Sequence, residues 1–196
     1  MKTISTLVDN PTITPELETT FETIKTELGA PFVPHFFQIW GHNPTALQGI
    51  VPAMKHILGS GVLDRKLKEM IMIAISSLKK CNYCETAHQV FCFSMGAEPE
   101  QIEFLVNSHT LPDSDNPKDK AAIDFAVRLS KHPNTSSKED FEKLKALGFS
   151  KAEILEVIAM SGMAVFYSHL ADATKITIDE GFTAALSKTE TTKANS

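Results

Sequence analysis

The sequence lacks the features that mark secreted, membrane-spanning and nucleic-acid-binding proteins. Its first stretch, MKTISTLVDNPTITP, carries one Lys and no apolar run of the kind that a secretory signal needs. The most apolar segment, residues 70–78, is shorter than the roughly 20 residues that cross a bilayer. A formal net charge of −5 and a pI near 5.8 leave no basic patch for phosphate groups. We therefore expect a cytoplasmic protein without a nucleic-acid or membrane partner.

Cysteine is scarce, and its distribution is informative. The chain has three cysteines in 196 residues, and all of them fall within residues 81–92. Such bunching does not build the disulfide framework of a secreted domain; in a reducing compartment it is typical of redox or metal chemistry. The remaining composition, 42% hydrophobic and 22% charged, is that of a globular protein long enough to bury a core.

Strand signals are also missing. No segment alternates convincingly between polar and apolar residues, and neither Asn-Gly nor Asp-Gly occurs as a hairpin turn. The closest strand candidate, residues 175–178, is short and isolated. Helix starts are frequent instead, with capping residues before Pro at 14–15, 43–44 and 116–117 and capping boxes at 136–139 and 150–153. The sequence predicts an all-α fold with helices at roughly 15–28, 34–41, 44–58, 64–79, 81–95, 98–106, 117–131, 137–147, 151–172 and 178–186.

The chain is predicted to form one helical domain over residues 1–186, followed by a disordered polar tail at 187–196. A polar connector at 107–120 separates two possible degenerate repeats, residues 30–106 and 117–186. Their alignment places Glu69 on Glu156, Cys81 on Ser168 and Cys84 on Ala171. Capped amphipathic helices resemble one another, so duplication and chance both stay open.

The chemistry is expected in residues 68–96. Cys81 and Cys84 form a C-x-x-C at the start of a predicted helix, where the positive end of the helix dipole lowers a thiol pKa below about 8.5. His88 follows Cys84 at i+4, within reach of that sulfur as a general base. Glu69, on the preceding helix, can orient the imidazole; the alternative is an ion pair with Arg65. This pattern predicts a redox-active dithiol.

A zinc site is the main competing interpretation of the sulfur spacing. Its remaining ligands would be His88 and Cys92, on the same helix as the C-x-x-C. A straight helix separates Cys84 from Cys92 by about 12 Å, whereas tetrahedral ligands lie about 2 Å from one metal. Haem attachment needs His after the second cysteine, where Glu85 stands. We therefore predict no metal and no cofactor, and Cys92 as a small buried hydrophobe.

These residues resemble the core motif of the alkylhydroperoxidase D-like, carboxymuconolactone decarboxylase superfamily, in its peroxidase-related branch. The motif comprises Glu69, Cys81-Asn82-Tyr83-Cys84, Ala87-His88 and Gly96. The preceding segment PFVPHFFQIWGHNPTALQGI is also similar, so the resemblance covers roughly residues 30–185. It implies an alkylhydroperoxidase D-like multi-helix fold, a homo-oligomer (trimer or hexamer), and a dithiol that reduces hydroperoxides in an antioxidant role.

The resemblance also implies a role for each site residue. Cys84 is then the peroxide-reactive thiol, deprotonated through His88 and Glu69, and Cys81 resolves its sulfenic acid as a disulfide. An external dithiol or protein reductant restores the pair. Helix position alone would favour the first cysteine as nucleophile, whereas the i+4 histidine and the resemblance favour Cys84. Tyr83 stands where alkylhydroperoxidase D has a His, and a tyrosine with a pKa near 10 is a poor base at neutral pH.

Two other functions stay open on the sequence. One is a non-catalytic oligomer that senses redox state or binds a partner. The other is a cofactor-free decarboxylase acting on a small lactone acid, although the decarboxylase branch of the superfamily lacks the C-x-x-C.

Overall fold

The computed structural model describes residues 3–194, with side chains up to Lys188. Helices are the regular elements of that range, and an isolated antiparallel bridge joins Ser5 to Ile176, inside the segment 175–178. The all-α prediction is confirmed. The helices are α1 (Pro15–Leu28), α2 (His35–Gln38), η1 (Ile39–His42), α3 (Pro44–Ala53), η2 (Met54–Gly59), α4 (Arg65–Lys79), α5 (Asn82–Ser94), α6 (Pro99–Asn107), α7 (Pro117–Lys131), η3 (Pro133–Thr135), α8 (Lys138–Ala146), α9 (Lys151–Thr174) and α10 (Glu180–Ala194).

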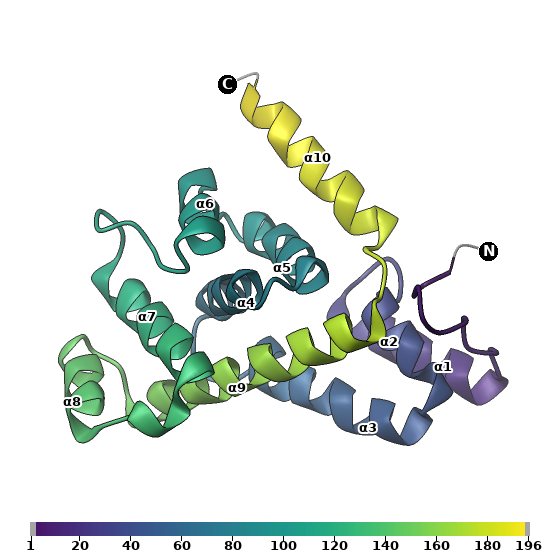
Figure 1. The fold of residues 1–196 in the computed structure, drawn as a ribbon, viewed down its shortest axis with the longest axis horizontal. Coiled ribbons are helices and arrows are strands. Elements are labelled where there is room, and N and C mark those ends of the chain that lie inside the picture. Colours follow the sequence, from purple (N-terminus) through teal and green to yellow (C-terminus); the bar gives the residue numbers. More distant parts are fainter. Residues whose placement is uncertain (1–2, 195–196) are drawn as a thin grey trace.

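Helix α4 lies at the centre of the molecule, with α5, α6, α7 and α9 packed around it (Figure 1). Every residue from Leu67 to Ser77 is buried, because apolar side chains cover most of the circumference of the helix. The same burial carries two ionisable side chains, Lys68 and Glu69, into the interior. Each of them needs a partner there, since an unpaired buried charge is costly.

The turn between α4 and α5 sets the position of the C-x-x-C. Lys80 adopts the left-handed conformation, with φ of 61°, and its N–H bonds back to the last turn of α4. Cys81 is then the residue that caps the N-terminus of α5, and Cys84 is the third residue of that helix. The predicted starts of both helices are within one residue of the observed ones. The capping box predicted at 136–139 is formed one residue later, by Ser137 and Asp140.

One predicted helix, residues 44–58, changes its pitch part-way. Helix α3 ends at Ala53, and the chain continues as the π-helix η2. Pro52 has no N–H for the helical ladder. The Ile50 carbonyl also accepts a hydrogen bond from the hydroxyl of Tyr167, at 2.5 Å. These two changes in hydrogen bonding accompany the wider turns of the π-helix. Residues of η2 form part of the wall of a cavity.

A buried ion pair anchors the turn between η2 and α4 to α9. Lys68, which is 1% exposed, donates to the carbonyls of Ile57 in η2 and Ser60 in the turn, and it lies 3.0 Å from Glu156 Oε2. Glu156 accepts the backbone N–H groups of residues 62 and 63 at 2.8 and 2.7 Å. Gly61 has φ of +107°, and a Cβ there would lie 2.1 Å from Glu156 Oε1. Glycine is therefore required at this position.

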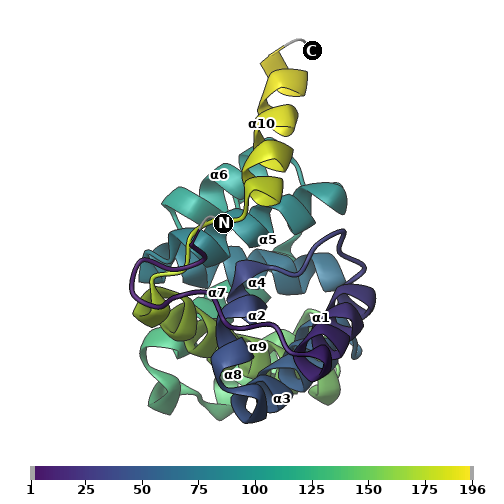
Figure 2. The same ribbon diagram turned by 90° about the vertical axis from the view of Figure 1, so that its right-hand side faces the viewer.

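Helix α10 rises away from the body of the molecule in both views (Figures 1 and 2). It is longer than the predicted helix, which ends at 186, because its backbone stays helical to Ala194. Side chains after Lys188 lie outside the described residues. The disorder predicted for residues 187–196 therefore stays a prediction.

The suggested repeat of residues 30–106 in 117–186 also stays a prediction. Helices α4 and α9 each start with a capping side chain, and they pack against each other. They differ where the alignment places the cysteines. The chain breaks between α4 and α5 just before Cys81, whereas α9 runs unbroken through Ser168 and Ala171.

Among the helices in the described range, only α9 is long and apolar enough to cross a membrane by length and composition. The mean hydropathy of its most apolar window is 1.5, and 50% of that window is buried in the fold. Core helices of soluble proteins have the same properties, and α9 contacts α4, α5, α7 and α8. Helix α9 is therefore packed as a core helix of this fold.

Candidate active site

Glu69 and His88 meet in the interior between α4 and α5. His88 Nδ1 lies 2.5 Å from Glu69 Oε2, with 7% and 0% of the two side chains exposed. The other oxygen of Glu69 accepts two hydrogen bonds from the Arg65 guanidinium, one of them from Nε at 2.8 Å. The two partners considered for Glu69 therefore coexist, one on each carboxylate oxygen.

The carboxyl group of Glu69 is ionised despite its burial. Burial alone would raise its pKa, but the charges and hydrogen bonds of His88 and Arg65 outweigh that effect and lower the pKa. A carboxylate can only accept, so a neutral His88 donates from Nδ1 and keeps its lone pair on Nε2. Glu69 thus fixes the imidazole in the tautomer that can take a proton on Nε2.

Cys81 and Cys84 are both free thiols at the start of α5, and they share a hydrogen bond. Cys81 is 0% exposed and Cys84 is 4% exposed. The hydrogen bond with Cys84 lowers the pKa of Cys81, against the effect of burial and of Asp172. The same hydrogen bond, together with burial, raises the pKa of Cys84 well above its ordinary value. In the reduced pair, Cys81 is therefore the thiol that ionises more readily.

A cavity of 740 Å³, here the main cavity, opens beside the site. Cys84 and His88 line it, whereas Cys81 does not. This volume is in the range of pockets that hold organic ligands of many atoms. Aromatic and aliphatic side chains from five helices form much of its wall, including Phe36, Leu58, Phe91, Tyr167 and Phe182. A large apolar molecule can therefore reach the sulfur of Cys84.

Tyr83, inside the C-x-x-C, is held by hydrogen bonds. Its hydroxyl donates to Asp179 Oδ2 at 2.7 Å and accepts the backbone N–H of Phe36 at 3.1 Å. Burial and the charge of Asp179 raise the pKa of Tyr83 well above its ordinary value. Burial raises the pKa of Asp179 as well. Tyr83 thus stays neutral and ties α5 to α2 and to the turn before α10; a part for it in proton transfer stays a prediction.

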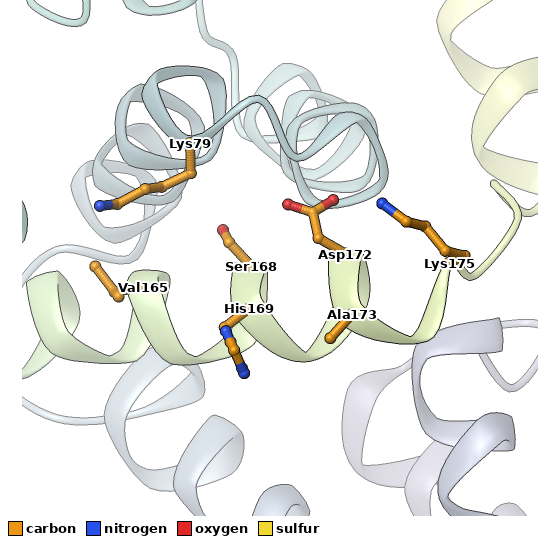
Figure 3. Close-up of a pocket in the computed structure, with 7 residues that line it drawn as sticks. All are labelled: Lys79, Val165, Ser168, His169, Asp172, Ala173 and Lys175. Carbon is orange, nitrogen blue, oxygen red and sulfur yellow. The ribbon is translucent and has the colours of Figure 1, made fainter.

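Two residues that the sequence analysis misses reach the thiols from α9. Ser168, whose hydroxyl lies 3.3 Å from the hydroxyl of Ser76, lowers the pKa of Cys84, whereas Asp172 raises the pKa of Cys81. Both also line a second cavity of 480 Å³, here the α9 cavity (Figure 3). No local spacing could have revealed them, because they lie far along the chain and meet the cysteines only through the packing of α9 on α4 and α5.

Cys92 lies apart from this chemistry. It is 0% exposed, and burial raises its pKa to about 12, which suits a small buried hydrophobe. Within the described part of the chain, no group of three or more His, Cys, Asp and Glu side chains is placed to hold a metal ion.

The fold and the site together define a helical protein with a buried dithiol and a glutamate–histidine pair beside an apolar cavity. The family model described as "Carboxymuconolactone decarboxylase family" matches residues 44–128, which include the whole C-x-x-C and both members of the pair. Over residues 44–128 the chain is therefore similar to this family, and its fold is that of alkylhydroperoxidase D-like proteins. No curated protein matches the sequence.

Solved structures share the fold at low sequence identity. A peroxidase-related protein with an alkylhydroperoxidase AhpD core from Ralstonia eutropha JMP134 has a TM-score of 0.81 and 21% identity, covering 93% of this chain and 96% of that one. A peroxidase-related protein from Silicibacter sp. TM1040 has a TM-score of 0.78 and 24% identity, covering 89% and 92%. The debrominase Bmp8 has a TM-score of 0.72 and 23% identity, covering 94% and 98%.

Proposed function

We propose that the protein is a cytoplasmic, thiol-dependent peroxidase that reduces organic hydroperoxides through Cys81 and Cys84. One observation carries the proposal. Cys84 and His88 line the same apolar cavity, and a buried Glu69 holds His88 in the tautomer that accepts a proton. That arrangement supplies a sulfur, a base and a space for an organic substrate at one place.

The reaction starts when Cys84 gives its proton to Nε2 of His88. The thiolate attacks one oxygen of the hydroperoxide, the O–O bond breaks, and the alkoxide takes the proton from His88 and leaves as an alcohol. Cys84 is then a sulfenic acid. Cys81 attacks its sulfur, and the disulfide forms as water leaves. An external dithiol reduces the disulfide by exchange. The net reaction converts hydroperoxide and dithiol into alcohol, water and an oxidised dithiol.

Access to the main cavity favours Cys84 as the attacking sulfur. The peroxide must touch the sulfur that attacks it, and Cys84, unlike Cys81, lines the main cavity. The lowered pKa of Cys81 is compatible with this assignment.

The test is mass spectrometry of the cysteines after one equivalent of cumene hydroperoxide. The wild-type protein should form the disulfide between Cys81 and Cys84, and Cys81→Ser should retain a sulfenic acid on Cys84. Cys84→Ser should lose peroxide turnover with a dithiol donor, whereas the matched control Cys92→Ser should keep it. Full turnover by Cys84→Ser would refute the proposal. Decarboxylation of a small lactone acid that survives in the double variant Cys81→Ser, Cys84→Ser would favour a reaction without the dithiol.

A second candidate is reductive removal of a halogen from an aromatic ring. The similarity to the debrominase Bmp8, which has been crystallised as a cysteine-to-alanine variant with 2,3,4-tribromopyrrole, and the aromatic wall of the main cavity support it. In this reaction, two thiols become a disulfide, a ring hydrogen replaces bromine, and hydrogen bromide leaves. Bromide release from 2,3,4-tribromopyrrole in the presence of a dithiol, compared with turnover of cumene hydroperoxide, decides between the two activities.

The homo-oligomer implied by the resemblance is also part of the proposal. Large apolar side chains are exposed on α9, with Leu155 60% and Phe166 48% accessible. Exposed groups of this size are frequent at contacts between subunits. Analytical ultracentrifugation should give the mass of a trimer or hexamer, and a monomer would contradict this part of the proposal.

A further inference from the structure

The main cavity has a charged side as well as an apolar one. The side chains that line it from α2, α9 and α10 are aromatic: Phe36, Phe37, Tyr167 and Phe182. Apart from His88, the charged and basic side chains of the lining come from the end of α1, from η2 and from the first residue of α4: Glu27, Lys55, His56 and Arg65. A ligand that matches both sides has an apolar body and a charged group.

Arg65 is a cation of this lining with hydrogen-bonding capacity left over. Its Nε and Nη2 atoms donate to the same oxygen of Glu69. A guanidinium has five N–H groups, so both N–H groups of Nη1 and one of Nη2 remain. No further hydrogen bond from Arg65 forms within the part of the chain that the structure describes. Its side chain is 36% exposed, so this second edge of the guanidinium can be reached by a ligand.

The shape of that edge selects the charged group. The Nη1 and Nη2 atoms of a guanidinium present two parallel N–H groups, which bind a carboxylate through two hydrogen bonds at once. Lys55, the other cation of the lining, already forms an ion pair with Glu27 at 2.5 Å, and both residues line the cavity. The charges of Lys55 and Glu27 offset each other, whereas Arg65 offers a free edge to a second carboxylate.

Glu69 holds Arg65 in place beside the reactive groups. The guanidinium is fixed by its two hydrogen bonds to Glu69, so a ligand would not have to order a mobile side chain. The other oxygen of Glu69 lies 2.5 Å from Nδ1 of His88. An anion on Arg65 is therefore separated from a peroxide at His88 by little more than the Glu69 carboxylate and the imidazole ring. The charge of the ligand and its hydroperoxide group must be close together in the molecule.

We propose that the main cavity is specific for hydroperoxides of apolar carboxylic acids. The carboxylate binds the Nη1–Nη2 edge of Arg65, and the apolar body lies against the aromatic side chains of the cavity. The inference rests on the proposed function and names its substrate class. The hydroperoxide group is reduced at Cys84 by the reaction described above, so the product is a hydroxy acid whose carboxylate is unchanged.

Gly59 allows the proposed anion position to be filled from within the protein. It is the last residue of η2, and it lines the main cavity. A Cβ at Gly59 would lie 3.6 Å from Nη1 of Arg65, which is an ordinary contact distance. Gly59→Asp therefore brings a carboxylate to the free edge of the guanidinium. Gly59→Asn has the same shape without the charge and is the matched control.

The test compares cumene hydroperoxide with its para-carboxylate, which adds one negative charge to the same apolar body. Both are assayed for kcat/KM with a dithiol donor, and the ratio of acid to neutral substrate removes effects on the thiols themselves. The wild-type ratio should be about 10, through KM rather than kcat. It should fall to about one in Gly59→Asp and stay near the wild-type value in Gly59→Asn. High salt should lower the wild-type ratio, because Arg65 is partly exposed.

Two further variants and a binding measurement complete the design. Arg65→Lys keeps a positive charge beside Glu69 but loses the paired N–H groups, so the ratio should fall at least about 3-fold. Lys55→Gln should change the ratio less than about 2-fold, because Lys55 is bound to Glu27. The two product alcohols undergo no reaction. In isothermal titration calorimetry, the alcohol with the para-carboxylate should bind the wild-type protein about 10-fold more tightly than the neutral alcohol.

A wild-type ratio of one or less refutes the inference and leaves the proposed function in place. Equal ratios in Gly59→Asp and Gly59→Asn refute the assignment of the anion to Arg65, as does a ratio that falls in Lys55→Gln alone. If Gly59→Asp does not fold, Arg65→Lys against Lys55→Gln decides. If neither hydroperoxide is reduced, the proposed function is wrong; tighter binding of the acidic alcohol, lost in Gly59→Asp, would still support the anion site.

Discussion

Replacing Glu69 by Gln tests the centre of the proposed site. The side chain keeps its size, so no cavity forms, but the negative charge that holds both Arg65 and His88 is lost. An amide can accept on one atom only and presents a donor on the other. At least one of the two partners therefore loses its hydrogen bond, and Arg65 loses its ionic partner.

The expected loss of stability is about 3 kcal/mol. Removing one member of a buried charge pair costs about 3–5 kcal/mol, and Glu69 is fully buried. The lower end of this range of free energies applies, because 36% of the Arg65 side chain is exposed and water can solvate the guanidinium. A loss of this size changes the unfolding equilibrium by about 100-fold. With a slope of roughly 2–3 kcal/mol per molar urea, the unfolding midpoint falls by about 1 M.

The assay is urea unfolding followed by circular dichroism across a range of pH. The pKa of Glu69 is lowered from its ordinary value of 4.5. The stability that ionised Glu69 contributes is therefore fully present above about pH 4.5. It is lost as the pH falls through the lower pKa that Glu69 has in the folded protein. The difference between wild type and Glu69→Gln should be constant near neutral pH and shrink in acid. Peroxide turnover should fall about 100-fold, because His88 loses the partner that fixes its tautomer.

Glu139→Gln is the matched control. Glu139 forms an i,i+4 pair with Lys143, but 76% and 70% of the two side chains are exposed. Its loss should cost less than about 0.5 kcal/mol. Equal urea unfolding midpoints for wild type and Glu69→Gln would refute the reasoning. Equal losses of stability in Glu69→Gln and Glu139→Gln would refute it as well.

Four further predictions concern single side chains. Tyr83→Phe should lower stability by about 1–2 kcal/mol, measured in urea, through the lost hydrogen bond to a buried carboxylate; peroxide turnover should stay close to wild type, and its loss would make the hydroxyl catalytic. Lys68→Met should cost about 3 kcal/mol in the same assay, because a carboxylate and two carbonyls lose their donor. Iodoacetamide at about pH 8 should leave Cys92 unmodified in the folded protein, because burial raises its pKa to about 12; rapid labelling, detected by mass spectrometry, would contradict this. Ala87→Trp should fill the main cavity, so kcat/KM for cumene hydroperoxide should fall at least about 10-fold more than for hydrogen peroxide; parallel losses would mean that the substrate binds elsewhere.

The helices could be predicted well because their ends are fixed by local chemistry. The Thr14, Asn43 and Asn116 side chains each cap the helix that the following Pro begins. The π-helix after Ala53 could not be predicted. It depends partly on Tyr167, which bonds to Ile50 from a distant part of the chain.

The candidate site likewise has residues that could be predicted from the sequence and residues that could not. Cys81, Cys84 and His88 could be found because one turn of helix relates them, and Glu69 because it lies on the adjoining helix. Ser168, Asp172 and Asp179 could not, since they reach the motif from the other end of the chain. Nor could spacing show that the hydrogen bond between the thiols lowers the pKa of Cys81, or that Cys84 alone of the two lines the main cavity.

The sequence by itself therefore determined the helices and the reactive groups, because both depend on residues a few positions apart. The tertiary structure decided what each group can do. It buried Glu69 between Arg65 and His88, and it opened the main cavity to Cys84 but not to Cys81. These properties depend on burial, charge and access, which arise only when distant helices pack together.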